Sequence, residues 1–477
     1  MIWKHSLVYL LARLVPGLLN FVALALYTRL LTPEQYGSYT LVMAATGFLQ
    51  LLLFGWISQS LLRYLPRFAD REAAFLSTVM AVYGGIGAVA LLVALVAALV
   101  ALVYPAAILV SLAAWLLLAW SAFELGLQLQ NSRFQPGSYS FMSVLKALTA
   151  LAGGGGLVWL GFGAAGILGG LVLGNLLPLW LFSRHQLRQF DRRLVEREIL
   201  GHLWRYGLPL SASVLMSEVI YSSDRLLLAW LAGKGSAGQY AVAYDLPAFT
   251  LNMLMMGINL AAYPALVQAL ERGDSRQVRD CRLQHFRLLF AVALPATVGL
   301  ILVAPNLVEL MIGAEFRPAV RRLLPVIAVA VLLSGLKAYY FDLAFQLGEH
   351  PRGQLQILVL AAGLNLMLNG VLIPRQGMQG AALATLITFG VALLLSAVRG
   401  RRHFPLVFPL ADLGRMMLAV GVMVAVLVPL YDTRGAGWLL LQVLGGAAVY
   451  GVVLLLVSGR SWGWSGYPLS TLPFISR

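Results

Sequence analysis

The segment Tyr27-Thr-Arg-Leu-Leu-Thr-Pro-Glu-Gln-Tyr-Gly-Ser-Tyr39 separates two long apolar stretches near the start of the chain. A similar arrangement recurs about 200 residues later, where a polar-spotted apolar helix leads through Asp224-Arg-Leu-Leu-Leu to Ala237-Gly-Gln-Tyr-Ala-Val-Ala-Tyr244. Two copies of one unit can face each other and build a single site between them. The repeat therefore predicts two helical bundles around a central cavity.

The composition places the chain in a membrane. Of its 477 residues, 60% are hydrophobic and only 11% are charged, whereas roughly a quarter are charged in an ordinary soluble domain. Because a membrane-spanning helix needs about 20 apolar residues, this composition allows about fourteen spans. We therefore predict an all-α polytopic membrane protein of about fourteen transmembrane helices.

The apolar stretches divide the chain into four predicted parts. Residues 1–183 form an N-terminal six-helix bundle, 184–205 a cytoplasmic amphipathic linker, 206–398 a second six-helix bundle, and 399–477 two additional helices and a tail. The predicted spans are 6–28, 38–62, 75–103, 106–127, 139–160, 163–183, 206–231, 238–267, 286–311, 321–346, 354–373, 378–398, 409–430 and 437–457. Because an even number of spans separates the repeats, a parallel repeat about an axis along the membrane normal is expected.

Basic residues decide the predicted orientation. The loops that carry most of the Lys and Arg residues include 184–205 and 272–287, and the positive-inside rule assigns them to the cytoplasm. We expect a bacterial cytoplasmic (inner) membrane protein whose two termini are both cytoplasmic. The net charge of +15 reports this topology and contact with anionic lipid rather than nucleic-acid binding.

Polar residues inside the first span lie on one face. Arg13, Asn20 and Tyr27 are spaced seven apart, which keeps them aligned with only about 20° of drift per heptad. A charge left in hydrocarbon is costly, so such residues face a partner or a wet cavity. In the second span, Thr46 and Gln50 also share a face. We predict that Arg13, Asn20 and Gln50 line the cavity.

The spans that open the second repeat are polar in the same way. The seventh carries Ser211, Glu218 and Arg225, and the eighth carries Asp245, Asn252 and Asn259, again at intervals of seven. We predict Glu218, Asn252 and Asn259 as cavity residues. Glu218 and Asp245 are also candidates for ion coupling. Apolar surroundings disfavour the charged form of a carboxyl group, so such a group can take up and release a proton near neutral pH. The alternative is that both are held in salt bridges.

Two lysines complete the predicted substrate site. Lys146 and Lys337 lie inside the fifth and tenth spans, where they could bind an anionic group such as a phosphate. The alternative is an interhelical ion pair with Glu218, Asp224, Asp245 or Asp342 that only holds the helices together.

No enzymatic or metal site is expected. The chain has one cysteine, Cys281, so Cys-based metal sites are excluded. The run Gly153–Gly156 lacks the lysine and hydroxyl residue of a phosphate loop and instead predicts close helix packing. Loops are too short for a soluble catalytic domain. We predict neither cofactor nor metal, and a protein that is not an enzyme.

Three segments resemble a known superfamily. Arg29-Leu-Leu-Thr-Pro-Glu-Gln-Tyr-Gly-Ser-Tyr39, Asp224-Arg-Leu-Leu-Leu with Gly238-Gln-Tyr-Ala-Val-Ala-Tyr244, and Leu364-Asn-Leu-Met-Leu-Asn-Gly-Val-Leu-Ile-Pro374 with Gly377-Met-Gln-Gly380 are similar to polysaccharide transporters. This family, which includes the Wzx-type oligosaccharide flippases, belongs to the superfamily that also contains multidrug exporters. The resemblance covers nearly the whole chain and identifies architecture better than cargo.

The resemblance implies a function. It implies that a polyprenyl-diphosphate-linked oligosaccharide, an O-antigen or exopolysaccharide repeat unit, is flipped from the inner to the outer leaflet by alternating access. A polysaccharide polymerase and glycosyltransferases would be the partners. Lipid II flippases crowd several cationic residues into their first helices, and here only Arg13 lies well inside the first two, which disfavours that cargo.

Other functions remain open from the sequence. A cation-coupled multidrug exporter of the same superfamily would use Glu218 and Asp245 for the ion, although the basic residues in the cavity argue against it. A membrane polymerase or ligase would need a large outer loop, and a non-transporting scaffold would not need the internal charges.

Overall fold

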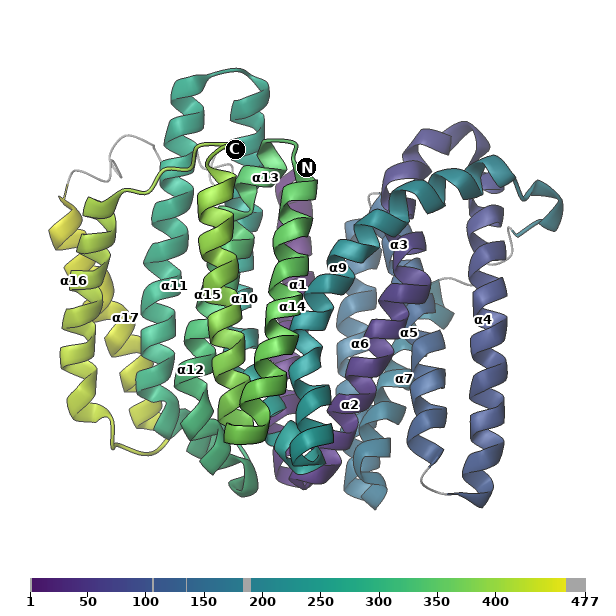
Figure 1. The fold of residues 1–477 in the computed structure, drawn as a ribbon, viewed down its shortest axis with the longest axis horizontal. Helices are drawn as coiled ribbons and strands as arrows, with labels where there is room; N and C mark the ends of the chain where they lie inside the picture. The colour runs from purple at the N-terminus through teal and green to yellow at the C-terminus, as the bar shows by residue number, and fades with distance from the viewer. Residues whose placement is uncertain (1, 105–106, 134, 183–189, 460–477) are drawn as a thin grey trace. The chain divides into compact units, whose positions relative to one another are not determined.

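The computed structural model describes residues 2–104, 107–133, 135–182 and 190–459, with the backbone alone for residues 2–14 and 62. The regular structure of these residues is helical (Figure 1), which confirms the predicted all-α class. By their packing, the residues form two compact units, Met1–Ala241 and Val242–Arg477.

The first unit is a bundle of long helices and short connecting segments. It contains α1 (Ile2–Leu30), α2 (Pro33–Gln50), η1 (Leu51–Gly55), α3 (Trp56–Tyr64), η2 (Leu65–Arg71), α4 (Glu72–Val103), α5 (Ile108–Ser132), α6 (Pro136–Leu157), η4 (Val158–Phe162), α7 (Gly163–Phe182), η5 (Arg192–Leu194), α9 (Arg197–Ala232) and the start of α10 (Lys234–Glu271).

The second unit contains the rest of α10 and ten further elements. They are α11 (Ser275–Met311), η6 (Ala314–Phe316), α12 (Arg317–Leu336), η7 (Lys337–Phe341), α13 (Leu343–Leu347), α14 (Pro351–Gln376), α15 (Met378–Gly400), α16 (Leu410–Leu427), η8 (Val428–Leu430) and α17 (Ala436–Ser458).

The described residues contain eleven stretches that are long and apolar enough to cross a membrane. One of them, 136–182, holds both α6 and α7, and neither α1 nor α9 is among the eleven. The protein is therefore a multi-pass membrane protein, while the count of fourteen spans stays a prediction. In α9 the reason is composition, since polar residues reduce its hydropathy.

The two copies of the repeated segment meet inside the first unit. Thr32 caps α2, since its hydroxyl accepts the Gln35 N–H at 3.4 Å while Gln35 Oε1 accepts the Thr32 N–H at 3.2 Å. A Cβ added at Gly37 would overlap the carbonyl of Lys234. A Cβ added at Gly238 would overlap the carbonyl of Pro33 in turn.

This contact is reciprocal. Pro33 precedes Gly37 by the same interval by which Lys234 precedes Gly238, so each glycine lies against the first residue of the other copy's helix. A Cβ at Gly37 would also lie 3.2 Å from the Gly238 nitrogen, and one at Gly238 would lie 2.7 Å from the Gly37 nitrogen. Such mutual contact is typical of two copies related by a two-fold axis.

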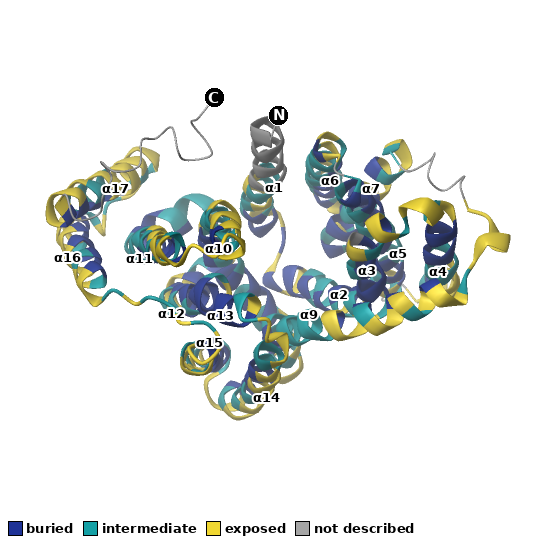
Figure 2. Ribbon diagram, turned by 90° about the horizontal axis from the view of Figure 1, so that it is seen from above, coloured by how far each residue is buried: buried dark blue, intermediate teal, exposed yellow. Residues whose placement is uncertain are grey.

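Helix α9 packs along α2 and α3 in the first unit (Figure 2). Ser60 donates to the Leu203 carbonyl at 3.0 Å, and a Cβ at Gly207 would overlap the Trp56 carbonyl. Ile199 and Leu203, both 0% exposed, join the apolar core formed by α3 and α4. Helix α9 therefore belongs to the first compact unit, Met1–Ala241, and the predicted division into four parts stays a prediction.

Helical hairpins of the same geometry occur in both units. Gly163, the first residue of α7, has φ 54° and ψ −134°, and Gly377, directly before α15, has φ 55° and ψ −131°. A positive φ of this kind is readily available only to glycine. A Cβ at Gly166 would lie 2.8 Å from the Val158 nitrogen, and one at Gly380 would overlap the Leu372 carbonyl. The shared geometry supports the predicted internal repeat.

Helices α6 and α7 pack closely through glycines. A Cβ added at Gly170 would overlap the backbone of Gly154, and one at Gly174 would lie 2.8 Å from the Lys146 carbonyl oxygen. Tyr27 of α1 donates to the Ala150 carbonyl at 3.4 Å. The predicted packing role of the run Gly153–Gly156 is thereby confirmed at Gly154, while a Cβ at Gly156 would meet no atom within 4 Å.

The hairpin of α16 and α17 is attached to α11 at both ends, and the three helices lie side by side (Figure 1). Arg287 Nε contacts Asp412 Oδ2 at 2.8 Å. Toward the other end of α11, Asn306 donates to Gln442 Oε1 at 3.2 Å and accepts from the Gly435 N–H at 2.9 Å. These polar contacts hold a hairpin whose remaining surface is mostly exposed and apolar.

The reciprocal contact generates a stability prediction. Gly37→Ala and Gly238→Ala should each reduce the free energy of unfolding by about 1–3 kcal/mol, because each new methyl group overlaps a backbone carbonyl. Thermal unfolding of the detergent-purified protein, followed by size-exclusion chromatography, measures the change. The control is Gly201→Ala on α9, whose added Cβ meets no atom within 4 Å. Equal stability of all three variants would contradict the close contact.

Candidate functional site

Lys146 of α6 lies over aromatic rings of α5. Its Nζ is 4.5 Å from the centroid of the Phe123 ring and 5.8 Å from that of Trp120. A cation over an aromatic face is stabilised by about 0.5–2 kcal/mol, more when water is excluded. Glu124, next to Phe123, adds an attractive charge. Lys146 forms no salt bridge with any residue that the structure describes, so its charge is held mainly by rings.

The Trp120 ring continues this arrangement toward α2 and α9. A Cβ added at Gly47 would lie 3.6 Å from Trp120 Cη2 and 3.8 Å from Glu218 Oε1. The ring and the carboxylate therefore share the space that the absent side chain leaves. Ser222, one turn along α9, donates a hydrogen bond to Glu218 Oε1. We define Lys146, Trp120, Gly47 and Glu218 as the α5–α9 polar cluster.

Buried hydroxyl groups lie along the same helices. The hydroxyls of Thr46 on α2 and Ser211 on α9 are buried and have no hydrogen-bond partner within the described part of the chain. A buried hydroxyl without a partner costs about 1–3 kcal/mol. These positions are therefore suited to receive water or the polar groups of a ligand. Gln50, at the end of α2, is also buried, at 5% exposed.

The first span contributes less to the described site. Asn20 is exposed on α1. Arg13 lies in the helical part of α1, but its side chain is outside the described residues. The roles of Arg13, Asn20 and Gln50 as cavity residues stay predictions.

In the second unit, Lys337 is paired with Asp342. Lys337 Nζ lies 2.7 Å from Asp342 Oδ2, and the two side chains are 7% and 3% exposed. Ser396 donates to Asp342 Oδ1 at 2.8 Å, and Gln354 donates to Oδ2 at 3.2 Å. The carboxylate thus accepts hydrogen bonds from two helices, α14 and α15, and from the π-helical turn η7. This is the ion pair that the sequence left open as the alternative to anion binding.

The polar residues of α10 in this unit are half-buried. Asn252 lies near Gly335 of α12, since a Cβ there would be 3.8 Å from Asn252 Oδ1. The Asn259 Oδ1 atom is buried without a hydrogen-bond partner in the described residues. Asp245 is half-buried near the start of the unit. None of the three is joined to Lys337 by a hydrogen bond or salt bridge between described residues.

Sequence reasoning missed several of these residues. Trp120 and Phe123 were assigned no role, although Trp120 lies one helical turn before Glu124 and Phe123 directly precedes it. Asn365 and Asn369, both 0% exposed, are joined by a 3.0 Å hydrogen bond between their side chains. Their spacing of four residues in an apolar span was the available signal.

The arrangement of the helices and their polar side chains indicates the class of protein. Long apolar helices, two repeated units and polar side chains inside the spans are typical of a polytopic membrane transporter. The family model described as "polysaccharide biosynthesis protein" matches residues 26–321. The chain belongs to this family.

Two relatives are similar in sequence, both from Haloferax volcanii. A probable flippase, AglR, is 26% identical over 245 residues, which is 50% of each chain. The match thus spans about half the length of AglR. A probable low-salt glycan biosynthesis flippase, Agl15, is 21% identical over 338 residues, which is 70% of each chain.

Solved structures share the fold. The lipid II flippase MurJ in an inward closed conformation is similar with a TM-score of 0.75 and 16% identity, over 95% of this chain and 99% of MurJ. An inward-facing multidrug resistance transporter of the MATE family has a TM-score of 0.59 and 17% identity, over 81% and 94%. The fold is therefore that of the predicted superfamily.

The Lys337 pair generates the second prediction. Lys337→Met should reduce the free energy of unfolding by about 3–5 kcal/mol, because it leaves a buried carboxylate unpaired. Thermal unfolding in detergent measures the loss. Lys337→Met combined with Asp342→Asn should recover part of it, since no charge then remains. Lys234→Met, at an exposed position, is the control. Unchanged stability of the single variant would contradict a structural role for the pair.

Proposed function

We propose that the protein flips a polyprenyl-diphosphate-linked oligosaccharide from the inner to the outer leaflet by alternating access. The observation that carries the proposal is the α5–α9 polar cluster in a chain of the polysaccharide biosynthesis family. A sugar and diphosphate head cannot cross hydrocarbon unaided, because its polar groups would lose their hydrogen bonds to water. The cluster offers groups that can replace that water.

Each member of the cluster suits one part of such a head group. The Lys146 ammonium lies 4.5 Å from the Phe123 centroid and forms no salt bridge with a described residue, so it can bind a phosphate. The Trp120 ring offers an apolar face to a sugar ring. Glu218 accepts hydrogen bonds, as its bond from Ser222 illustrates. Arg13, Asn20 and Gln50 of the same unit would complete the contacts, and Asn252 and Asn259 of the second unit stay proposed cavity residues.

The relatives support this substrate class. AglR and Agl15 are described as probable flippases, and Agl15 as one of glycan biosynthesis. We transfer that activity to this chain as part of the proposal, with an O-antigen or exopolysaccharide repeat unit as cargo. A polysaccharide polymerase and glycosyltransferases are the proposed partners. The proposed location is the bacterial cytoplasmic membrane, with both termini in the cytoplasm.

A cation-coupled multidrug exporter is the second candidate. The fold similarity to MATE transporters favours it, and Glu218 and Asp245 would then bind the ion. The Lys146 ammonium argues against it, because a cation inside the site repels a cationic drug. Glu218 and Asp245 can equally serve ion coupling in the flippase.

The flippase reading predicts an accumulating lipid. Cells that lack the protein should accumulate a polyprenyl-linked oligosaccharide, which mass spectrometry of lipid extracts detects and identifies. In these cells the Lys146→Met variant should leave the lipid accumulated, because the phosphate loses its cation. The Lys234→Met variant should restore the lipid to its normal level. Arg13→Ala and Glu218→Gln should behave like Lys146→Met at normal membrane levels. Absence of the lipid, with new sensitivity to cationic drugs, would favour the exporter.

The proposed orientation predicts a labelling pattern. In a Cys281→Ser background, Arg192→Cys should resist an impermeant maleimide in intact cells, and Lys234→Cys should react, because the two exposed positions are assigned to opposite sides. Permeabilised cells should label both and serve as the control. Reaction of the cysteine at position 192 in intact cells would contradict the proposed orientation.

A further inference from the structure

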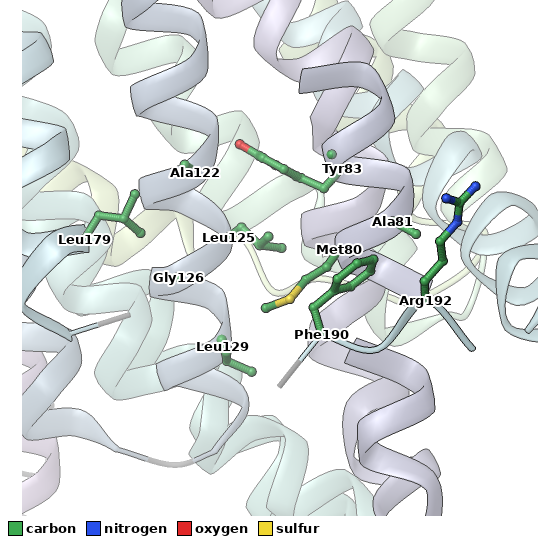
Figure 3. A pocket seen from close by; sticks show the side chains of 11 residues that line it. Met80, Ala81, Tyr83, Ala122, Leu125, Gly126, Leu129, Leu179, Phe190 and Arg192 are labelled. Carbon is green, nitrogen blue, oxygen red and sulfur yellow. The ribbon is translucent and has the colours of Figure 1, made fainter. Parts of the chain in front are cut away.

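A cavity in the first unit lies away from the α5–α9 polar cluster. It has a volume of about 750 Å³, within the range of about 300–1,000 Å³ typical of ligand pockets. Helices α4, α5 and α7 and the segment before η5 form its walls (Figure 3). The lining residues are Met80, Ala81, Tyr83, Gly84, Ala122, Leu125, Gly126, Leu129, Leu179, Phe190 and Arg192.

The chemistry of this cavity is divided between wall and rim. Among the described residues that line it, all are apolar except Tyr83, which contributes a phenol, and Arg192, which is the only charged one. Arg192 is exposed and makes no salt bridge with a described residue. The arginines nearby differ, because Arg71 pairs with Glu196 at 3.1 Å and Arg133 pairs with Glu72. The cation at the rim is therefore available for an anion.

The rim is held in place by α4. The N–H of Asp191 donates to Ser77 Oγ at 3.1 Å, and the N–H of Glu196 donates to Thr78 Oγ1 at 3.0 Å. Both hydroxyl residues are 0% exposed. Two successive residues of α4 thus fix the segment that carries Phe190 and Arg192, so the rim is part of the folded bundle.

We propose that this cavity holds one acyl chain of an anionic membrane phospholipid, whose phosphate lies against Arg192. Apolar walls suit the chain, and a free guanidinium suits the phosphate through paired hydrogen bonds. The cavity lies at the ends of α4, α5 and α7 where Arg71, Arg133 and Arg192 gather. Such basic ends face the leaflet that carries anionic lipid.

The charge of Arg192 and the size of the cavity favour an anionic phospholipid over two other lipids. A zwitterionic phospholipid also carries a phosphate, but its own ammonium group already neutralises that phosphate, whereas an anionic phospholipid leaves its charge for the Arg192 guanidinium. A polyprenyl tail of the cargo is much longer than an acyl chain and would leave most of its length outside a cavity of about 750 Å³. The proposal is independent of the flippase assignment, because the cavity and the α5–α9 polar cluster share no residue.

Photo-cross-linking of the full-length protein in phosphatidylcholine vesicles tests the proposal. The probe is phosphatidylglycerol with a diazirine on its acyl chain, and matched diazirine phosphatidylcholine is the comparison. Peptides that contain Met80 and Leu129, which line the cavity, should carry the label. Arg192→Gln should reduce phosphatidylglycerol labelling about fivefold, while Arg193→Gln, which alters an exposed neighbour outside the lining, should not.

A pair of glycines on α4 provides the test of the cavity itself. A Cβ at Gly84 or at Gly85 meets no atom within 4 Å, but only Gly84 lines the cavity. Gly84→Phe should therefore abolish labelling by filling the space, and Gly85→Phe should retain it. Size-exclusion chromatography confirms that each variant is folded. If Gly84→Phe misfolds, the exposed Arg192→Gln variant decides.

Three results would overturn the proposal. The first is labelling of folded Gly84→Phe at the level of the parent protein. The second is equal labelling by phosphatidylcholine and phosphatidylglycerol with no effect of Arg192→Gln, which would show a non-specific apolar groove. The third is competition by a polyprenyl phosphate but not by unlabelled phosphatidylglycerol, which would assign the cavity to the cargo's lipid.

Discussion

The close approach of two helix starts, at Gly37 and Gly238, is the constraint on which the first unit depends. Each glycine lies against the first residue of the other helix, Lys234 or Pro33, so neither position has room for a Cβ. This contact joins the two copies of the repeated segment directly. Asp224 strengthens it from α9, because its buried carboxylate accepts a hydrogen bond from Tyr240 at 2.7 Å. The repeat is therefore a packing device as well as a sequence pattern.

The two internal lysines differ in how their buried charge is stabilised. Lys337 sits beside Asp342, whose remaining oxygen positions are filled by Ser396 and Gln354. The pair is buried, so removal of one partner would leave a buried ion. The role of Lys337 as a cavity residue stays a prediction. Lys146 is instead held over Phe123. The aromatic rings stabilise the ammonium group but accept none of its conventional hydrogen bonds. Its N–H donors are therefore left for a phosphate.

The described part of the first unit thus contains two separate regions of different chemistry. The α5–α9 polar cluster combines a cation, an indole ring and a carboxylate around Gly47. The cavity bounded by α4, α5 and α7 is apolar, with Arg192 at its rim. Helix α5 contributes to both, with Trp120 in the cluster and Leu125 in the cavity. One helix therefore presents aromatic side chains to one region and aliphatic side chains to the other.

The sequence by itself determined the helical membrane class and the repeat, because composition and residue spacing are properties of the chain alone. It also singled out Lys146, Glu218 and Lys337, since a charge inside an apolar span is visible without a structure. Only the tertiary structure decided that, among the described residues, Lys337 rather than Lys146 forms a salt bridge, and that Trp120 and Glu218 both approach Gly47. It also decided that α9 packs with the first unit. These facts depend on contacts between residues distant in the chain, and helical periodicity fixes which face a residue occupies but not which helix that face meets.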